Sequence, residues 1–314
     1  MASSILNSIF RSLGTSVSAQ IPAGALYGFS PLTRRWVQEG PPPPKTSKPE
    51  VLEISVLSWN IDFMKPYVTQ RWKVALDNIQ HLLCLPTPAI LLFQETATEA
   101  FPAILSHPFV REHFLLSNTS PPSGYSTLIL VSRALLSCCE GSVTTTRVRY
   151  GELSKMNRDC LYVDLEVSLA NKTRRARIAT THLESLDGFG TATRPKQLAL
   201  AAQLLTNDDI DGGLVAGDMN CIGPDEETLP ERTGLTDAWI AVKGSDAVAE
   251  EGYTWGYQPP SRFPKRRMDK ILTVGKLEVT EIQRVGVGLE AEIEPGEKAW
   301  VSDHFGLLAK VVLR

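Results

Sequence analysis

The stretch LVAGDMNCIG, residues 214–223, begins as an apolar run and turns polar where a buried strand would stop. Asp218 and Asn220 stand two positions apart, so on an extended segment their side chains point to the same face. Taken alone, both are also common turn residues. Because polar groups at the end of a buried strand are costly without partners, the stretch favours a strand that ends at a polar site.

Regular apolar patterns lie on both sides of this stretch. Strands are predicted at residues 51–59, 89–95, 126–132, 160–169, 176–183, 212–218, 267–274 and 305–313. Because long strand-rich stretches contain few helical patterns, we expect an α/β fold of the α+β kind. Its two β-sheets would pack face to face, with helices on the outside.

Two helices are predicted from the spacing of apolar residues. A helix over residues 70–84 places one apolar face toward the core, formed by Trp72, Leu76, Ile79 and Leu83. A second helix is predicted to start at Pro195, because the fixed φ of proline suits the first helical turn. Its apolar side chains are Leu198, Ala201, Ala202 and Leu205.

The first 50 residues differ in composition from the rest of the chain. Residues 1–26 are rich in serine and include Arg11, and no acidic residue precedes Glu39, which is typical of an organellar transit peptide. A disordered tail explains the same composition. Residues 39–50, EGPPPPKTSKPE, favour an extended Pro-rich linker. We therefore expect residues 1–50 to form a disordered or targeting tail and residues 51–314 to form one folded domain.

Composition limits the class of protein. With 314 residues and 43% hydrophobic positions, the chain can bury a large core. The net charge of −3 means that nucleic-acid binding would depend on local basic patches, such as residues 173–177 and 264–270. No apolar stretch reaches the roughly 18 residues that span a membrane, so we expect no membrane partner. Five cysteines without metal-type spacing indicate a reducing compartment.

The strand-end pattern of residues 214–223 recurs elsewhere. Polar side chains stand at or beside the ends of other apolar runs, namely Asn60, Glu95, His182, Asp303 and His304. Each has a structural explanation when taken alone: Glu95 can begin a helix, Asp303 can be a solvated loop acid, and His182 can be an ordinary strand residue. Their joint occurrence at several strand ends favours one shared polar site.

Such a site suits a hard cation. Mg²⁺ prefers oxygen ligands, and the carboxylates of Glu95, Asp218 and Asp303 provide them. Asn60 and Asn220 add amide groups that can hold a phosphate oxygen or a water. The residue types at these strand ends therefore indicate a site for a metal ion together with a phosphate.

Two histidines and one further carboxylate complete the pattern. His182 and His304 offer donors to negative charge that develops on phosphorus. One of them needs an acceptor that fixes its tautomer, and Asp269 in RRMDKI is the candidate. The three residues thus point to phosphoryl chemistry.

Six motifs occur in an order that resembles the endonuclease/exonuclease/phosphatase superfamily. They are LSWNID (57–62), LLFQET (91–96), TTHLES (180–185), AGDMN (216–220), RRMDKI (266–271) and SDHFGLL (302–308). The resemblance covers residues 51–314. Within the superfamily the chain is most similar to the tyrosyl-DNA phosphodiesterases, through WNID, THLES, GYSTLILVSR (124–133) and YTWG (253–256). The resemblance implies a four-layer sandwich of two mixed β-sheets flanked by helices, as in deoxyribonuclease I.

The resemblance also implies residue roles at the metal and the water. Glu95 would be the principal Mg²⁺ ligand, with Mn²⁺ as an alternative metal. Asp303 would assist, and Asn60 would help to hold metal or phosphate. Asp218 would position and activate the attacking water.

Further roles concern the phosphate and the substrate groove. The phosphate oxygens would be bound by Asn220 and His182. His304, held by Asp269, would stabilise the transition state. Tyr125 would contact the phosphate, although a strand-edge aromatic is the alternative. Other groove positions are implied for Ser185 and Trp255.

The implied substrate is a DNA end, single-stranded or frayed, that carries a 5′-phosphotyrosyl adduct left by a trapped topoisomerase. The resemblance suggests a location in the nucleus, whereas the N-terminal composition suggests mitochondria. A monomer is expected.

Two positions depart from the subfamily pattern. Ile222 stands where those enzymes have an arginine that contacts DNA, and Gly256 stands where they have an aspartate. Arg194 and the basic residues 265–267 can replace the missing charge, or they can belong to a solvated face.

Other functions therefore stay open. The first alternative is another phosphodiesterase of the superfamily, such as an abasic-site endonuclease, a ribonuclease, or an inositol-phosphate or sphingomyelin phosphodiesterase. The second is a catalytically silent binding module. Silent members usually lose their metal carboxylates, and this chain retains Glu95, Asp218 and Asp303.

Overall fold

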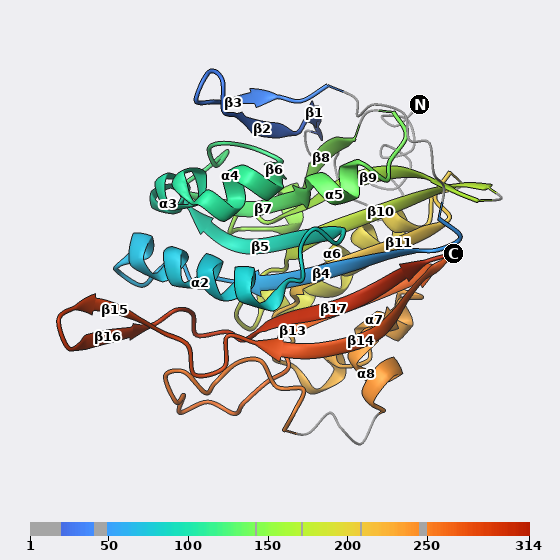
Figure 1. The fold of residues 1–314 in the computed structure, drawn as a ribbon. Helices are drawn as coiled ribbons and strands as arrows, with labels where there is room; N and C mark the ends of the chain where they lie inside the picture. Colours follow the sequence, from blue (N-terminus) through green and yellow to red (C-terminus); the bar gives the residue numbers. More distant parts are fainter. Residues whose placement is uncertain (1–19, 41–48, 142, 171, 208, 245–249) are drawn as a thin grey trace.

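The computed structural model describes residues 20–40, 49–141, 143–170, 172–207, 209–244 and 250–314. In this part of the chain, two β-sheets pack face to face and helices cover their outer faces (Figure 1). The predicted sandwich of two mixed sheets flanked by helices is confirmed.

The first sheet has seven strands. They are β1 (Gln20–Ala25), β8 (Thr144–Arg149), β9 (Asp159–Leu169), β10 (Lys172–His182), β11 (Gly212–Asp218), β12 (Thr236–Asp237) and β13 (Asp269–Gly275). Their order across the sheet is β1-β8-β9-β10-β11-β13-β12. The pair β10–β11 is parallel, and the other neighbours are antiparallel.

The second sheet has eight strands. They are β2 (Tyr27–Ser30), β3 (Arg35–Gln38), β4 (Leu52–Asn60), β5 (Ala89–Ala97), β6 (Phe114–Leu116), β7 (Tyr125–Ser132), β14 (Leu277–Val285) and β17 (Gly306–Leu313). Their order is β14-β17-β4-β5-β7-β6-β2-β3, and β4–β5 is the parallel pair. A separate hairpin projects from the sandwich (Figure 1), formed by β15 (Glu290–Glu294) and β16 (Glu297–Trp300).

Helices pack on both outer faces. The eight-stranded sheet is covered by α2 (Val68–Leu82), α3 (Phe101–Ser106) and α4 (Pro108–His113), and the seven-stranded sheet by α6 (Phe189–Leu205) and α7 (Leu229–Arg232). The remaining short elements are α5 (Arg133–Leu136), α8 (Ala238–Lys243) and the 3₁₀ turns η1 (Thr98–Ala100), η2 (Gly151–Leu153) and η3 (Pro224–Glu226). The apolar face predicted for α2 is buried as expected. Among the described residues, no helix is both long and apolar enough to cross a membrane.

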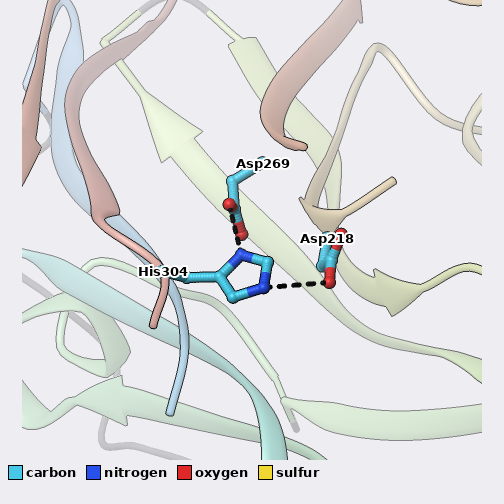
Figure 2. A group of neighbouring side chains, drawn as sticks. All are labelled: Asp218, Asp269 and His304. Carbon is cyan, nitrogen blue, oxygen red and sulfur yellow. Dashed lines mark hydrogen bonds and ion pairs between the residues drawn. The ribbon is translucent and has the colours of Figure 1, made fainter. Parts of the chain in front are cut away.

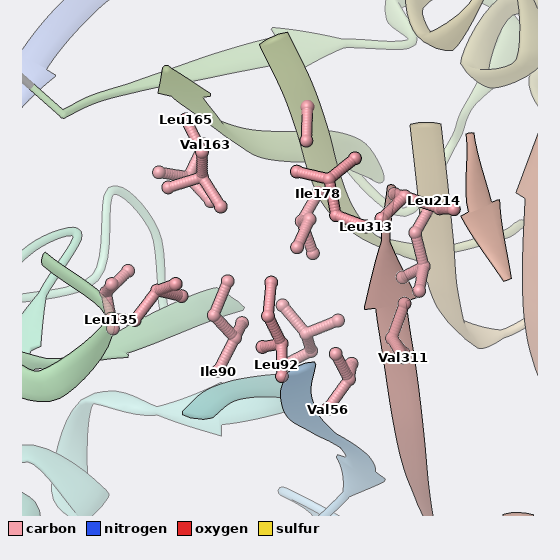
Figure 3. Close-up of a cluster of buried hydrophobic side chains, with 14 of the residues drawn as sticks. Val56, Ile90, Leu92, Leu135, Val163, Leu165, Ile178, Leu214, Val311 and Leu313 are labelled. Atoms are coloured by element: carbon pink, nitrogen blue, oxygen red, sulfur yellow. The ribbon is translucent and has the colours of Figure 1, made fainter. Parts of the chain in front are cut away.

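The main hydrophobic core lies between the two sheets (Figure 3). Val56 and Leu92 enter it from β4 and β5, and Ile178 and Leu214 enter it from β10 and β11; all four are fully buried. Burial of a side chain of this kind contributes ~1.5–3 kcal/mol. This core fixes the two parallel strand pairs against each other, which brings the polar residues at their ends together.

The folded domain begins earlier than predicted. Strands β1, β2 and β3 lie within residues 20–38, N-terminal to Val51, and β1 pairs with β8 while β2 pairs with β6. These strands are short, and pairing at the sheet edges stabilises them in a way that no local pattern reveals. Residues 1–19 and 41–48, on which most of the targeting and linker predictions fall, lie outside the described residues.

Helix α6 also begins earlier than predicted. It starts at Phe189, so Pro195 lies inside the helix and not at its first turn. The preceding turn is held by tertiary contacts, because the buried Arg194 guanidinium donates to the backbone carbonyls of Glu184 and Leu186. The predicted inward side chains of residues 198–205 are nevertheless buried.

Besides β1, β2 and β3, six strands of the described residues were not predicted from the sequence. They are β6, β8, β12, β14, β15 and β16. In β14 a register shift between Val279 and Glu281 breaks the alternation of apolar and polar residues. Charged residues dominate the β15–β16 hairpin, so its strands carry no apolar pattern.

Candidate active site

The strand topology brings the predicted polar residues to one edge of the sandwich. Asn60 ends β4, and His182 and Asp218 end the parallel strands β10 and β11. Asp269 begins the antiparallel strand β13, so its first residue lies at the same edge. In the register of the sheet, His182 pairs with Asp218, which in turn pairs with Asp269. Three candidate residues are thus neighbours across three strands.

The glycine of the AGDMN motif permits this alignment. A Cβ atom on Gly217 would lie 1.8 Å from the carbonyl oxygen of Thr181, so no larger residue fits between β10 and β11 here. After Asp218 the chain turns at Asn220, whose φ is +48°. The backbone N–H of Asn220 donates to Asp218 Oδ1 at 2.8 Å, and its side-chain amide donates to the Leu183 carbonyl at 3.0 Å.

Asp218 lies at the centre of the site. Its Oδ2 accepts a hydrogen bond from Asn60 Nδ2 at 3.1 Å and lies 3.2 Å from His182 Nε2. Burial by itself would raise the pKa of this carboxyl, but the nearby His304 and His182 hold the pKa well below its usual range. Asp218 is therefore a buried, ionised acceptor.

His304 and Asp269 form a buried pair beside Asp218 (Figure 2). His304 Nδ1 lies 2.8 Å from Asp269 Oδ2, and His304 Nε2 lies 3.7 Å from Asp218 Oδ2. Burial alone would lower the pKa of the imidazole, but Asp269, Asp303 and Asp218 raise it well above its ordinary value. The surrounding carboxylates therefore favour the protonated form of His304, in which both ring nitrogens are donors.

Three carboxylates gather beside this pair. Glu95, near the end of β5, accepts from the backbone N–H of Phe63 at 2.9 Å, and its φ of +58° is unusual for a residue other than glycine. Asp303 accepts from Trp255 Nε1 at 3.0 Å. The third is Asp62, whose pKa is raised to about 6 by burial and then by the charges of Asp303 and Glu95. The buried Arg71 guanidinium offsets only part of this negative charge, because the pKa of Asp62 stays raised.

Asp62 was not among the predicted site residues, although it closes the LSWNID motif. It follows the strand end at Asn60, has a φ of +41°, and donates its backbone N–H to Asn60 Oδ1 at 3.1 Å. The sequence feature that could have identified Asp62 is an acidic residue two positions after the strand-end asparagine.

Among the described residues, a different group of the site is compact enough to hold a metal. Ligand atoms of Asp218, Asp269 and His304 lie within 4.8 Å of one another. However, a protonated imidazole has no lone pair for a metal. The carboxylates of Asp62, Glu95 and Asp303 instead offer oxygen atoms of the kind that suits a hard cation.

Arg158 is a second residue that sequence reasoning missed. It lies at the end of the turn before β9, is buried, and places one terminal guanidinium nitrogen 2.6 Å from His182 Nδ1. A small pocket beside it is lined by Glu95, Tyr125 and His182. No local pattern singled out this arginine, because its partner lies 24 residues away in sequence.

Tyr125 and Ser185 lie around Met156, whereas Trp255 lies at Asp303. Tyr125 donates its hydroxyl to the Met156 carbonyl at 3.2 Å, and its ring stacks on Phe63 with centroids 4.1 Å apart. Ser185 Oγ lies 3.0 Å from the Met156 sulfur. Since Trp255 donates its indole N–H to Asp303, this side chain holds a carboxylate of the cluster. A phosphate contact by Tyr125 would require its hydroxyl to exchange its present partner.

The prediction that Arg194 contacts substrate is wrong. Its guanidinium is fully buried, and its five N–H donors meet Glu226, Thr191 and two backbone carbonyls. No donor is left for a phosphate. Arg194 is a structural residue that joins helix α6 to the segment after Asn220.

Part of the basic segment 265–267 is also engaged within the protein. Arg267 is buried against Asp237 and Glu227, and Lys270 pairs with Glu227 as well. These charges support the fold and do not line an open groove.

Backbone geometry explains one departure from the subfamily pattern. Gly256 has a φ of +98°, and a Cβ at this position would lie 3.1 Å from the Lys265 Cα. An aspartate at this position would therefore be strained. At the other departure, the backbone N–H of Ile222 donates to Glu226 Oε2 at 3.0 Å, so the segment after Asn220 is anchored through the buried Glu226.

Comparisons with known proteins agree with this architecture. The model of the Endonuclease/Exonuclease/phosphatase family matches residues 57–304. No curated protein matches the sequence closely enough to count as a relative. Among solved structures, the chain is similar to tyrosyl-DNA phosphodiesterase 2 (TDP2) from Caenorhabditis elegans, with 22% identity and a TM-score of 0.63 over 82% of this chain and 75% of that chain.

Two further structures have the same fold. TDP2 from D. rerio in complex with single-strand DNA product has 18% identity and a TM-score of 0.62, over 82% of this chain and 98% of that chain. An endonuclease/exonuclease/phosphatase family protein from Bacteroides thetaiotaomicron has 13% identity and a TM-score of 0.60, over 85% of this chain and 97% of that chain. The resemblance predicted from the motifs is confirmed.

Proposed function

The chain belongs to the Endonuclease/Exonuclease/phosphatase family, whose members are typically hydrolases of phosphate esters, and from this premise we propose that it is a Mg²⁺-dependent phosphodiesterase. Its proposed substrate is a DNA end that carries a 5′-phosphotyrosyl adduct. The main support is one juxtaposition: protonated His304 lies between Asp269 and the carboxylate of Asp303, with Asp218 alongside. Such a site offers a cation ligand, a water-binding group and a donor to phosphate.

The residues present fit Mg²⁺. Asp62, Glu95 and Asp303 would hold the ion with help from Asn60. Burial, and then the charges of Asp303 and Glu95, raise the pKa of Asp62, and a bound cation would offset those charges. When bound, Mg²⁺ neutralises charge on the phosphoryl oxygens. Mn²⁺ prefers similar ligands and is the alternative metal.

Asp218 is proposed to position the attacking water. Because its pKa is lowered, it stays ionised at neutral pH and accepts a hydrogen bond from the water. Asn60, His182 and the backbone of Asn220 hold the carboxylate in place. This arrangement favours in-line attack on phosphorus, where precise positioning supplies much of the rate.

His304 is proposed to stabilise the charge that develops on the phosphoryl oxygens. Its Nδ1–H is held by Asp269, which leaves Nε2–H as the donor toward the reacting phosphate. His182 and the Asn220 amide would add further donors. A tyrosine leaving group has a pKa near 10, so its departure makes little demand on a general acid.

Support for a DNA substrate comes from the motifs and from the fold shared with D. rerio TDP2, whose structure contains single-strand DNA product. The chain departs from this pattern at Ile222, and the guanidinium groups of Arg194 and Arg267 are engaged internally. These observations favour, as a second candidate, a phosphodiester substrate with fewer backbone phosphate contacts.

The proposal is tested with a panel of substrates in Mg²⁺ buffer: a 5′-phosphotyrosyl oligonucleotide, its 3′-phosphotyrosyl isomer, an abasic duplex, an RNA and a small phosphodiester. We expect preferred hydrolysis of the 5′ adduct, which EDTA and Asp218→Asn abolish. Preference for another substrate supports the second candidate. No turnover of any of them contradicts the phosphodiesterase and points to a silent binding module.

The cellular location is also a proposal. The resemblance favours the nucleus and the N-terminal composition favours mitochondria. Imaging of the full chain beside a version that lacks residues 1–19 distinguishes them, because this truncation leaves strands β1–β3 intact. The proposed monomeric state is tested by light scattering.

A further inference from the structure

The contact between Arg158 and His182 determines where the His182 ring carries its proton. A terminal nitrogen of Arg158 lies 2.6 Å from His182 Nδ1. Every guanidinium N–H is a donor, so Nδ1 must be the acceptor. The proton of the neutral ring then belongs on Nε2, which lies 3.2 Å from Asp218 Oδ2. We propose that Arg158 is a positioning residue that fixes His182 as the Nε2–H tautomer.

The surroundings of His182 offer a competing arrangement. His182 Nδ1 also lies 3.8 Å from Glu95 Oε1. Without Arg158, a proton on Nδ1 would face Glu95, and the lone pair on Nε2 would face the carboxylate of Asp218. That tautomer loses the hydrogen bond to Asp218 and engages a carboxylate of the cation site. Arg158 therefore selects between two arrangements that both have an acceptor nearby.

Arg158 is held in place by a hydrogen-bonded turn. Ser154 Oγ accepts from the backbone N–H groups of Met156 and Arg158, and it donates to Glu184 Oε2 at 2.6 Å. Glu184 Oε1 accepts from the backbone N–H of Lys155 at 2.9 Å. The buried carboxylate of Glu184, in the same THLES motif as His182, thus builds the turn that delivers Arg158.

In this arrangement, one buried polar group of Arg158 has no hydrogen-bond partner. Arg158 is 6% exposed, and its Nε is buried without a hydrogen-bond partner. Its other terminal nitrogen has only the Met156 sulfur at 3.6 Å, which is a weak acceptor. By contrast, Arg147 is equally buried and makes three short hydrogen bonds, to Asp159 and Thr127. Arg158 thus makes fewer strong hydrogen bonds than Arg147, and its guanidinium lies 5.6 Å from the centroid of the Tyr125 ring, which supports a role in the site.

For the reaction, this inference rests on the proposed function. Only the Nε2–H tautomer places a donor between Asp218 and a bound phosphate. Loss of such a group behind a reacting residue typically costs about 10–100-fold in activity. We therefore expect Arg158→Met to lower kcat by that factor with a smaller change in KM. Arg158→Lys keeps the positive charge but not the planar guanidinium group, so it should retain only part of the wild-type activity.

The decisive measurement is the tautomer itself, in substrate-free protein. Histidine labelled with ¹⁵N gives two-bond correlation patterns that distinguish Nδ1–H from Nε2–H, and His182→Gln identifies the signals of His182 among the five histidines. We expect the Nε2–H pattern in the wild type and a mixture of tautomers in Arg158→Met. Ethylguanidine added to Arg158→Ala restores the wild-type pattern and part of kcat.

Arg147→Met is the matched control, because it removes an equally buried arginine that does not touch His182. It lowers stability and leaves the His182 pattern unchanged. Should Arg158→Met fail to fold, Arg158→Ala with and without ethylguanidine gives the same reading of the tautomer. An Nδ1–H pattern in the wild type, or an unchanged pattern in the Arg158 variants, overturns the inference. Because no substrate is present, this outcome is independent of the substrate panel that tests the proposed function.

Discussion

Asn60 Nδ2 lies 3.1 Å from Asp218 Oδ2, and this hydrogen bond joins the end of β4 in one sheet to the end of β11 in the other. Both side chains are buried. Asn60 Oδ1 in turn accepts from the backbone N–H of Asp62. One amide therefore aligns the water-binding carboxylate with the carboxylate cluster, across the interface of the two sheets.

Asn60→Ala is expected to remove this alignment. Activity should fall by at least about 100-fold, as for other preorganised polar groups at a reacting centre. Unfolding free energy should fall by ~1–3 kcal/mol, since Asp218 and the Asp62 amide each lose a partner. Steady-state kinetics and urea unfolding measure the two effects. The matched variant Asn60→Asp keeps the shape and places a second acid against Asp218, so it should be equally inactive. Activity near the wild-type rate in either variant would exclude the alignment role.

The pH dependence of activity should report the His304–Asp269 pair. The folded pKa of His304 lies well above its ordinary value, so the imidazolium donor is present at neutral pH and is lost only as pH rises through the raised pKa. In Asp269→Asn, one of the charges that raise the pKa of His304 is removed, while burial still lowers this pKa. The pKa of His304 therefore falls. The alkaline limb of the kcat/KM profile should then move to lower pH, with lower activity at pH 8 than at pH 6. An alkaline limb that stays in place in Asp269→Asn would show that His304 is not the titrating donor.

Metal binding should couple to the charge of Asp62. Its pKa rises from 3.8 in the unfolded chain to about 6 in the fold, so the stability present below pH 4 is lost as pH rises through 6. At ~1.4 kcal/mol per pKa unit, the effect is on the order of 2–3 kcal/mol above pH 7 in metal-free protein. Asp62→Asn should raise the Tm in EDTA at pH 7.5 and reduce the Tm increase caused by Mg²⁺.

The same melting curves contain the control for Asp62. Glu112→Gln removes a largely exposed acid of α4 and should leave both Tm values unchanged. In wild-type protein, the Mg²⁺-induced increase in Tm should be larger at pH 7.5 than at pH 5, because protonated Asp62 does not bind the ion. A lower Tm for Asp62→Asn in EDTA at pH 7.5 would contradict the charge cluster.

Arg194 is expected to affect stability and not substrate binding. Arg194→Met leaves Glu226 buried without its partner, which typically costs about 3–5 kcal/mol. Urea unfolding measures the loss, and adding Glu226→Gln should recover part of it. KM of the folded enzyme should stay close to the wild-type value at low temperature. A KM increase that persists in the Arg194→Met, Glu226→Gln double variant would restore Arg194 to the substrate site.

The strand-end residues were predictable because polar side chains end apolar runs there, where burial without partners is costly. Apolar runs that stop at Asn60, His182 or Asp218 demand polar partners, and parallel strands place those ends at one edge. The sheet register then makes His182, Asp218 and Asp269 neighbours. The site and the sandwich could therefore be inferred together from local patterns.

Other features depend on contacts that are distant in sequence. Arg194 looked like a surface cation, and only its buried partner Glu226, 32 residues away, reveals a structural role. The role of Arg158 follows only from its contact with His182 Nδ1. Likewise, α6 extends past Pro195 because tertiary hydrogen bonds hold the turn before it. Composition and periodicity do not contain these pairings.

Ile222 provides the test of substrate class. If the substrate is DNA, Ile222→Arg places a guanidinium two residues beyond Asn220 and adds one phosphate contact. KM for a 5′-phosphotyrosyl oligonucleotide should fall by about 3–10-fold, and the slope of log KM against log salt should steepen by about 0.7, as expected for one phosphate on a single strand.

Ile222→Leu keeps the apolar side chain and is the matched control, with no change in either quantity. The backbone N–H of residue 222 still meets Glu226 in both variants, so the anchoring of the segment is preserved. KM for a small phosphodiester should be the same in all three proteins, because it lacks the additional phosphate. An oligonucleotide KM and salt slope that do not respond to Ile222→Arg would mean that DNA does not pass this position, and would favour the smaller phosphodiester as the substrate.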